Sequence, residues 1–171
     1  MHISKQIFKK VKKQGVKLES DWLEGYSREN IQRVMKAQGI DRLPKKVIEF
    51  LETMGERNPL FDVGQLASER LVKHKEDLRY HFKTDRPPVD YELPQDAFVF
   101  LVIKDGNCPF LYLHTDNDSE DPPVYEWIES DSEVGYDITL YADSFSSYID
   151  RITESYIRRY KKWQNKQYKG S

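Results

Sequence analysis

Cysteines, long apolar runs and an apolar N-terminal segment are missing from this chain, and each absence excludes a class of protein. Cys108 is the single cysteine among 171 residues, so no internal disulfide forms and no zinc-knuckle spacing exists. No window approaches the ~20 apolar residues of a membrane-spanning helix. Lysines interrupt residues 1–10 too often for the apolar core of a secretory signal. We therefore expect a soluble, cytoplasmic protein.

Basic residues are absent from one long section of the chain. Between Asp105 and Asp150 there are twelve Asp and Glu residues and no Lys or Arg, although the net charge of the whole chain is only −2. All 27 basic residues lie in the flanking segments. One part of the fold should therefore carry a negative field, which can steer a basic partner toward it.

Hydrophobic spacing and capping residues predict five helices within one domain over residues 1–171. The helices cover residues 3–14, 27–39, 44–55, 65–82 and a last segment that begins at Asp143 or Ser144 and passes Tyr160. Ser27 is a typical N-cap, and Gly39 and Gly55 are placed to end two helices, which we expect to form an αα-hairpin. The last helix ends in a basic tail that we expect to fray from about residue 162.

The predicted strands are concentrated in the second half of the chain. Apolar runs cover residues 97–103, 110–115 and 124–128. The first run is typical of a strand buried on both faces, and the Asp-Gly pair within residues 104–107 predicts a tight turn after it. The three runs predict an antiparallel meander over about residues 97–128, and residues 138–141 are a candidate fourth strand. The expected fold class is α+β, with helices packed against a mostly antiparallel, twisted sheet.

The acidic segment after the second strand is the candidate functional surface. A dense group of carboxylates can attract a partner whose own binding site is rich in Lys and Arg. Affinity also needs desolvated anchors, and Tyr125, Trp127 and Tyr136 are the nearest aromatic residues. The candidate partner-binding residues are Asp116, Asp118, Glu120, Asp121, Tyr125, Glu126, Trp127, Glu129, Asp131 and Glu133. The alternative is an ordinary solvated loop, with Trp127 packed in the core.

Other arrangements of reactive residues do not form a recognisable site. Cys108 and His114 could pair as thiolate and imidazole, but no third orienting group or oxyanion hole is identified. His74 and His81 are seven residues apart, whereas metal-binding helices usually place two histidines four apart. The basic tail has aromatic residues interleaved, as in single-strand nucleic-acid binders, yet cations at a helix C-terminus also complement the helix dipole.

The acidic loop also differs from a calcium loop. Asp116, Asp118 and Glu120 match its first three alternating ligand positions. The sixth position holds Asp121 in place of the turning glycine, and the twelfth holds Trp127 in place of a bidentate glutamate. We therefore expect no catalytic residues, no specific metal site and no cofactor.

A helix followed by four segments in a fixed order carries a family resemblance. The segments are GIDRLP at 39–44 with VIEFL at 47–51, DAFVFL at 96–101, PPVYEW at 122–127 and DSFSSYI at 143–149. This order resembles the SUKH superfamily, typified by fungal cell-wall regulators of the Smi/Knr type, and the resemblance covers residues 22–157. It implies a noncatalytic α+β domain. Two features depart from the pattern, since only Gly55 and Gly64 represent a glycine-rich turn and the charged segment 65–82 is long.

The resemblance also implies a protein partner. Bacterial members of the superfamily look like immunity proteins that neutralise a polymorphic toxin, often a nuclease, and fungal members serve as interaction scaffolds. Together with the acidic section, this predicts a noncatalytic immunity protein that occludes a cognate toxin domain with an acidic surface. The alternative is a regulatory protein-interaction scaffold of the Smi/Knr type. We expect no membrane partner and no direct binding of nucleic acid.

Overall fold

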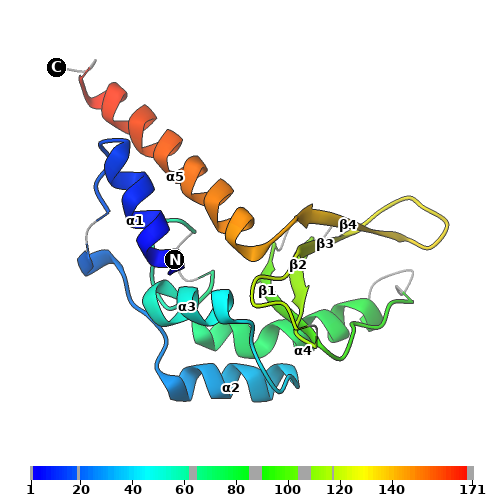
Figure 1. Cartoon of the computed structure of the whole chain (residues 1–171). Helices are drawn as coiled ribbons and strands as arrows, with labels where there is room; N and C mark the ends of the chain where they lie inside the picture. The colour runs from blue at the N-terminus through cyan, green and yellow to red at the C-terminus, as the bar shows by residue number, and fades with distance from the viewer. Residues whose placement is uncertain are drawn as a thin grey trace.

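The protein folds as an α+β domain in which helices pack against an antiparallel sheet, as Figure 1 shows for the computed structural model. The structure describes residues 2–18, 20–61, 65–84, 90–103, 109–116 and 118–168. In these residues four α-helices and a short 3-10 helix (Ser20–Trp22) come first, followed by four strands and a fifth α-helix. The predicted fold class is therefore confirmed.

The first three helices end where the capping residues predict. They are α1 (Ile3–Lys13), α2 (Arg28–Gln38) and α3 (Lys45–Met54). Ser27 Oγ accepts a hydrogen bond of 3.1 Å from the amide of Asn30 and so caps α2. Gly39 ends the same helix with a φ of 64°, a left-handed conformation that glycine adopts without a steric penalty.

The fourth helix, α4 (Ser68–Thr84), begins three residues later than the predicted start at residue 65. The Tyr26 hydroxyl donates a hydrogen bond to the carbonyl of Leu66, and the Glu56 carboxylate accepts one of 3.0 Å from the amide of Ser68. These contacts hold the preceding residues outside the helix and satisfy an amide at its start. Both partners are distant in sequence, so local spacing could not reveal them.

Helix α2 packs mainly along α4 and only weakly against α3, unlike the αα-hairpin that the sequence predicts. Arg33 donates a hydrogen bond of 2.9 Å to Ser68 Oγ, and Gln38 Nε2 donates one of 3.0 Å to the carbonyl of Leu71. Polar side chains of α2 therefore bind α4. The spacing of apolar residues along α2, on which the predicted αα-hairpin rests, gives no sign of these contacts.

The last helix, α5 (Phe145–Tyr168), is the longest at 24 residues and carries the predicted buried stripe. Its helical backbone continues to Tyr168, past residue 162, and the expected fraying of the basic tail stays a prediction. Figure 1 shows its C-terminal end extending past α1. Neither α5 nor any other helix within the described ranges is apolar and long enough to cross a membrane.

The sheet is the predicted meander extended by a fourth strand. Its strands are β1 (Ala97–Val102), β2 (Phe110–His114), β3 (Val124–Glu129) and β4 (Tyr136–Ala142). They lie in sequence order and every neighbouring pair is antiparallel. The tight turn predicted at residues 104–107 lies outside the described residues. Between β3 and β4, Gly135 has a φ of 80° and its carbonyl accepts a hydrogen bond of 3.1 Å from the amide of Ser130.

Strands β1 and β2 are buried on both faces, as their continuous apolar runs predict. One face packs on α1, α3 and α5 through Phe98, Phe100, Leu111 and Leu113. The other packs on the C-terminal half of α4 through Val99, Phe110, Tyr112 and Trp127. Strand β4 is different, because most of its residues are exposed. In the described residues its outer edge has no strand neighbour.

Candidate partner-binding surface

The loop between β2 and β3 holds four of the candidate acidic residues at one end of the sheet. Two of them face basic residues that precede or begin α3. A nitrogen of Arg42 lies 3.4 Å from an oxygen of Asp118, and Lys45 Nζ lies 3.5 Å from an oxygen of Glu120. The amide of Lys46 also donates a hydrogen bond of 2.9 Å to the carbonyl of Glu120. This loop is therefore held against α3, and part of its charge is neutralised within the molecule.

Asp121 caps the last helix. Its Oδ1 accepts a hydrogen bond of 2.8 Å from the amide of Ser146, in the first turn of α5. Ser144 Oγ accepts one of 3.0 Å from the amide of Ser147, so two of the free amides at this helix end are satisfied by side chains. The sequence analysis names Asp121 as a partner-binding residue, but in the structure its carboxylate caps α5.

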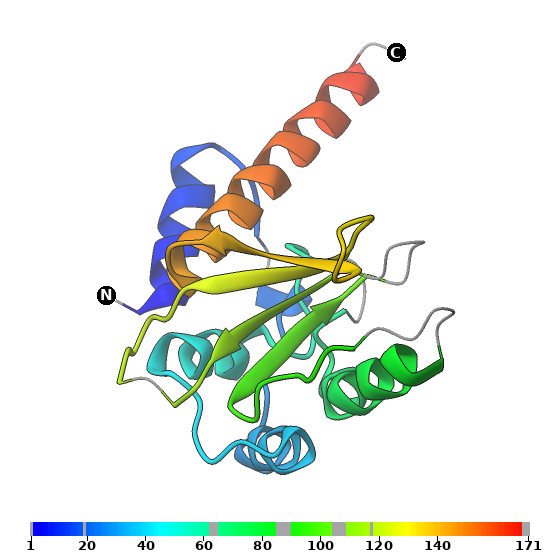
Figure 2. The same cartoon turned by 90° about the vertical axis from the view of Figure 1, so that its right-hand side faces the viewer.

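Three more acidic candidates lie at the opposite end of the sheet, in the β3–β4 hairpin. Glu129, Asp131 and Glu133 surround its turn, and Figure 2 shows this turn and the β2–β3 loop at opposite ends of β3. A strand of this length separates its ends by about 17 Å. In the described part of the chain no ion pair engages these three carboxylates. Apart from Glu126, which lies within β3, the acidic candidates therefore form two separate groups, whereas the sequence analysis treats them as one face.

The same hairpin exposes large apolar side chains. Val134 is 63% exposed and Leu140 is 56% exposed, and Ile138 and Tyr141 also reach the surface. Cross-strand register places Ile138 opposite Trp127 and Leu140 opposite Tyr125, so these side chains extend the aromatic face of the sheet toward solvent. Apolar and acidic groups are therefore adjacent on one hairpin at the free edge of the sheet.

The aromatic candidates differ in accessibility. Trp127 is fully buried at 0% exposure, with its ring stacked on Phe110 and Tyr136 at centroid distances of 5.1 and 5.7 Å. Its indole therefore lies in the core and is not accessible to a partner. This agrees with the alternative in the sequence analysis, in which Trp127 packs in the core. Tyr125 is half-buried and stacks on Tyr112 at 5.7 Å, so its outer surface remains accessible.

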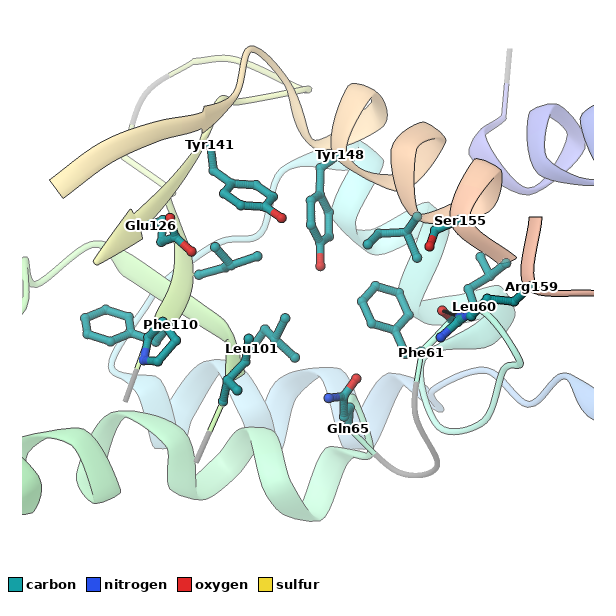
Figure 3. Close-up of a pocket in the computed structure, with 14 residues that line it drawn as sticks. Leu60, Phe61, Gln65, Leu101, Phe110, Glu126, Tyr141, Tyr148, Ser155 and Arg159 are labelled. Carbon is teal, nitrogen blue, oxygen red and sulfur yellow. Dashed lines mark hydrogen bonds between the residues drawn. The ribbon is translucent and has the colours of Figure 1, made fainter. Parts of the chain in front are cut away.

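Glu126 points to the opposite face of β3 and lines a small pocket of about 230 Å³ between the sheet and α5 (Figure 3). Tyr141 and Tyr148 enter this pocket from β4 and α5, and Arg159 lies farther along α5. The hydroxyl of Tyr148 has no hydrogen-bond partner among the described residues. Burial raises the pKa of Tyr148, because ionisation would place a charge in an apolar site.

Asp96, His114 and Asp116 form a compact polar cluster where β1 begins and β2 ends. His114 Nδ1 lies 2.8 Å from Asp96 Oδ2, and the rings of Tyr112 and Tyr125 pack edge-on against the imidazole. Burial alone would raise the pKa of Asp96, but hydrogen bonds with His114 and Asp116 hold it below its usual range. Cys108, the proposed thiol partner of His114, lies outside the described residues.

Lys75 is a second buried polar centre, at 1% exposure on α4. Its ammonium group donates hydrogen bonds of 2.7 and 2.8 Å to the carbonyls of Gln38 and Gln95. Burial lowers the pKa of Lys75 to about 8, and the charge of Arg79 acts in the same direction. This lysine therefore ties α4 to α2 and to the segment that leads into β1.

Comparison with known proteins decides the family. A sequence model of the SMI1/KNR4 family (SUKH-1) matches residues 25–151, which is most of the chain. The chain belongs to the SMI1/KNR4 family. The comparisons found no matching curated protein and no matching solved structure. The resemblance seen in the ordered sequence segments is thus confirmed at the level of the family.

Within this SUKH-1 domain, sequence reasoning missed the Asp96–His114–Asp116 cluster and the Gln38–Lys75 contact. A signal for the cluster was present, because His114 and Asp116 are two residues apart at the end of a predicted strand and Asp96 begins the strand that pairs with it. Pairing β1 with β2 as a hairpin would have predicted that these three residues lie close together. No comparable signal pointed to Gln38, since a polar residue on a helix is normally solvated.

Proposed function

We propose that this SUKH-1 protein is a noncatalytic immunity protein that neutralises a basic toxin domain by binding it through the β3–β4 hairpin. The observation that carries the proposal is the coincidence, on one free-edge hairpin, of exposed apolar residues and carboxylates without ion-pair partners in the described chain. Monomeric proteins seldom expose such a patch without using it for an interaction.

The charge of this region defines the kind of partner. The segment 105–150 contains no Lys or Arg, so every charged side chain that the hairpin itself contributes to the surface is acidic. A toxin that acts on nucleic acid binds phosphates with Lys and Arg, which makes its substrate site complementary to this surface. Charge complementarity of this kind accelerates association about 10–1,000-fold and disfavours acidic partners.

Affinity would come from the apolar residues beside the acids. Ile138 and Leu140 are each about half exposed, so burying the rest of either side chain contributes roughly 0.7–1.5 kcal/mol, and Tyr125 adds an amphipathic ring at the edge of the patch. The outer edge of β4 has no strand neighbour in the described residues, and Arg151 donates a hydrogen bond of 2.7 Å to the carbonyl of Tyr141. An extended segment of the partner could pair along the rest of this edge. The toxin would then be inhibited by steric and electrostatic occlusion, and no chemical step is required of the immunity protein.

The other acidic candidates fit this role less well. Asp118 and Glu120 are paired with Arg42 and Lys45, and Asp121 caps α5. A partner would have to break these contacts before it could use the same carboxylates. We therefore assign the main contact to Glu129, Asp131 and Glu133, with the β2–β3 loop in a secondary role.

Co-purification with the toxin domain encoded beside this gene tests the proposal. We expect the tagged protein to retain that domain at low salt and to suppress its toxicity when both are expressed together. An unrelated toxin domain of similar charge serves as the control, because nonspecific attraction would capture both. If no neighbouring toxin domain is bound, the immunity role is wrong and the regulatory scaffold of the Smi/Knr type becomes the better description.

A further inference from the structure

We propose that Asp96, His114 and Asp116 bind a divalent transition-metal ion of the zinc class. The cluster offers one imidazole nitrogen and two carboxylate oxygens, and these three atoms all lie within 4.8 Å of one another. Three protein ligands plus water is a common arrangement for zinc. This inference does not depend on the immunity role.

Strand pairing explains why residues so far apart in sequence meet. Ala97 pairs with His114 in the β1–β2 register, which brings Asp96 and Thr115 together at the next position. There the carbonyl of Asp96 accepts two hydrogen bonds from Thr115, one of 3.1 Å from the amide and one of 2.8 Å from the hydroxyl. The backbone of the cluster is therefore fixed by the sheet, as a preorganised metal site requires.

One of the three separations between ligand atoms already matches that of a coordination sphere. Ligand atoms that are 2.0–2.2 Å from one ion lie about 2.8–3.6 Å apart for tetrahedral or octahedral angles. The separation of 2.8 Å between His114 Nδ1 and Asp96 Oδ2 lies at the lower end of this range. Tyr112 and Tyr125 restrain the imidazole ring on its sides. The remaining ligand atoms lie within 4.8 Å, and rotation of the carboxylates would bring them to coordination distance.

The surroundings supply access and negative charge. The two aspartates line a surface cavity of about 400 Å³, which leaves room for water on the open side of an ion. Asp41 adds a third carboxylate to the same cavity. The cation in this cavity, Arg42, donates hydrogen bonds to the carbonyl of Thr115 (2.8 Å) and to Asp118, so part of its charge is directed to another carboxylate.

The donor set selects the ion. Calcium and magnesium prefer oxygen ligands throughout, whereas imidazole nitrogen favours zinc and neighbouring transition metals. We therefore expect Zn²⁺ and Co²⁺ to bind more tightly than Ca²⁺ or Mg²⁺. A bound ion would link the start of β1 to the β2–β3 loop through Asp116, and so would stabilise the folded chain by mass action.

Titration of the metal-free full-length protein with Zn²⁺ tests the site by calorimetry and thermal unfolding. With zinc at about 100 times its Kd we expect Tm to rise by about 5–10 °C. Co²⁺ should give the visible absorption bands of a coordinated ion. Asp116→Asn, at an exposed position that leaves the fold intact, should weaken zinc binding at least tenfold, and His114→Gln should weaken it as much or more.

His81→Gln on α4 is the matched control, because it removes a histidine distant in sequence from the cluster and should leave zinc affinity unchanged. Two results would overturn the site. One is zinc binding that is no tighter than calcium binding, which indicates a nonspecific acidic surface. The other is zinc affinity that survives both Asp116→Asn and His114→Gln while the metal-free Tm values match the wild type.

Discussion

The side-chain amide of Gln38 forms a pair of backbone-like hydrogen bonds with Val99 on β1. The amide of Val99 donates to Gln38 Oε1 at 2.8 Å, and Gln38 Nε2 donates to the carbonyl of Val99 at 2.8 Å. This side chain therefore takes the place of a neighbouring strand at the outer edge of β1. Without it, the buried amide and carbonyl of Val99 would be unpaired. The β1 edge is thus paired at Val99, whereas the outer edge of β4 has no strand neighbour in the described sheet.

Replacing Gln38 by leucine should destabilise the protein by about 3 kcal/mol or more. The substitution leaves the amide and carbonyl of Val99, and the carbonyl of Leu71, buried without a partner. Urea unfolding measures the loss. Gln32→Leu, at an exposed position on the same helix, should change stability by no more than about 0.5 kcal/mol. Equal effects of the two substitutions would show that the Gln38–Val99 pair contributes little.

Removing the Asp121 carboxylate should reduce stability, whereas removing a neighbouring acid should not. Asp121→Ala deletes the acceptor for the Ser146 amide and should cost about 1 kcal/mol, the usual value of a lost helix cap. Asp118→Ala removes a fully exposed side chain whose ion pair is solvated, and its effect should stay within about 0.5 kcal/mol. Chemical unfolding of both variants compares them. A larger loss for Asp118→Ala would contradict the capping role.

Deleting the hydroxyl of Tyr148 should be neutral or slightly stabilising. The group is buried without a partner in the described residues, so Tyr148→Phe removes a desolvated polar atom and no hydrogen bond. On the same helix the Tyr156 hydroxyl donates a bond of 3.1 Å to the carbonyl of Lys17, and Tyr156→Phe should cost about 1 kcal/mol. Thermal unfolding of the two variants gives the comparison. A clear loss for Tyr148→Phe would mean that its hydroxyl has a partner.

Lys75 should make stability depend on pH in the alkaline range. Its folded pKa of about 8 lies below the unfolded value of 10.5, so between these values the unfolded chain binds more protons than the folded chain. The free energy of unfolding therefore rises as the pH increases from about 8 to 10.5. Below pH 8 the lysine is protonated in both states and this gain in stability is absent. From pH 8 to 9.5 the wild type should gain about 1–2 kcal/mol relative to Lys75→Met.

Urea unfolding at several pH values measures this difference. Lys73→Met, at an exposed position of the same helix, is the control and should follow the wild-type curve. Only the slope with pH is diagnostic, because Lys75→Met also removes hydrogen bonds to two carbonyls and lowers stability at every pH. Parallel curves for the wild type and Lys75→Met would show that the ammonium group is not destabilised by burial.

Local patterns were sufficient to predict most of the secondary structure. Ser27 and Gly39 are caps whose chemistry acts within a few residues, and the apolar runs of β1 and β2 mark strands that are covered on both sides. The packing partner of α2 was not predictable in this way. It depends on Gln38, whose contacts with Leu71 and Val99 span 33 and 61 residues of sequence.

The division of the acidic residues follows from geometry that the sequence already implied. In an antiparallel meander successive connections lie at opposite ends of the strands, so the acids before and after β3 could not form one surface. Alternation along a strand likewise places neighbours such as Glu126 and Trp127 on opposite faces. The role of Asp121 required the three-dimensional structure, because its contact with Ser146 is 25 residues distant in sequence.

The affinity for the cognate toxin domain, measured for two matched charge-reversal variants, tests the central claim most directly. Asp131→Lys/Glu133→Lys reverses two charges on the β3–β4 hairpin, and Asp118→Lys/Glu120→Lys reverses two on the β2–β3 loop. We predict that the hairpin variant raises Kd at least about 100-fold, and the loop variant less than about fivefold. A hairpin variant that binds as tightly as the wild type, or a loop variant that alone abolishes binding, would contradict the account.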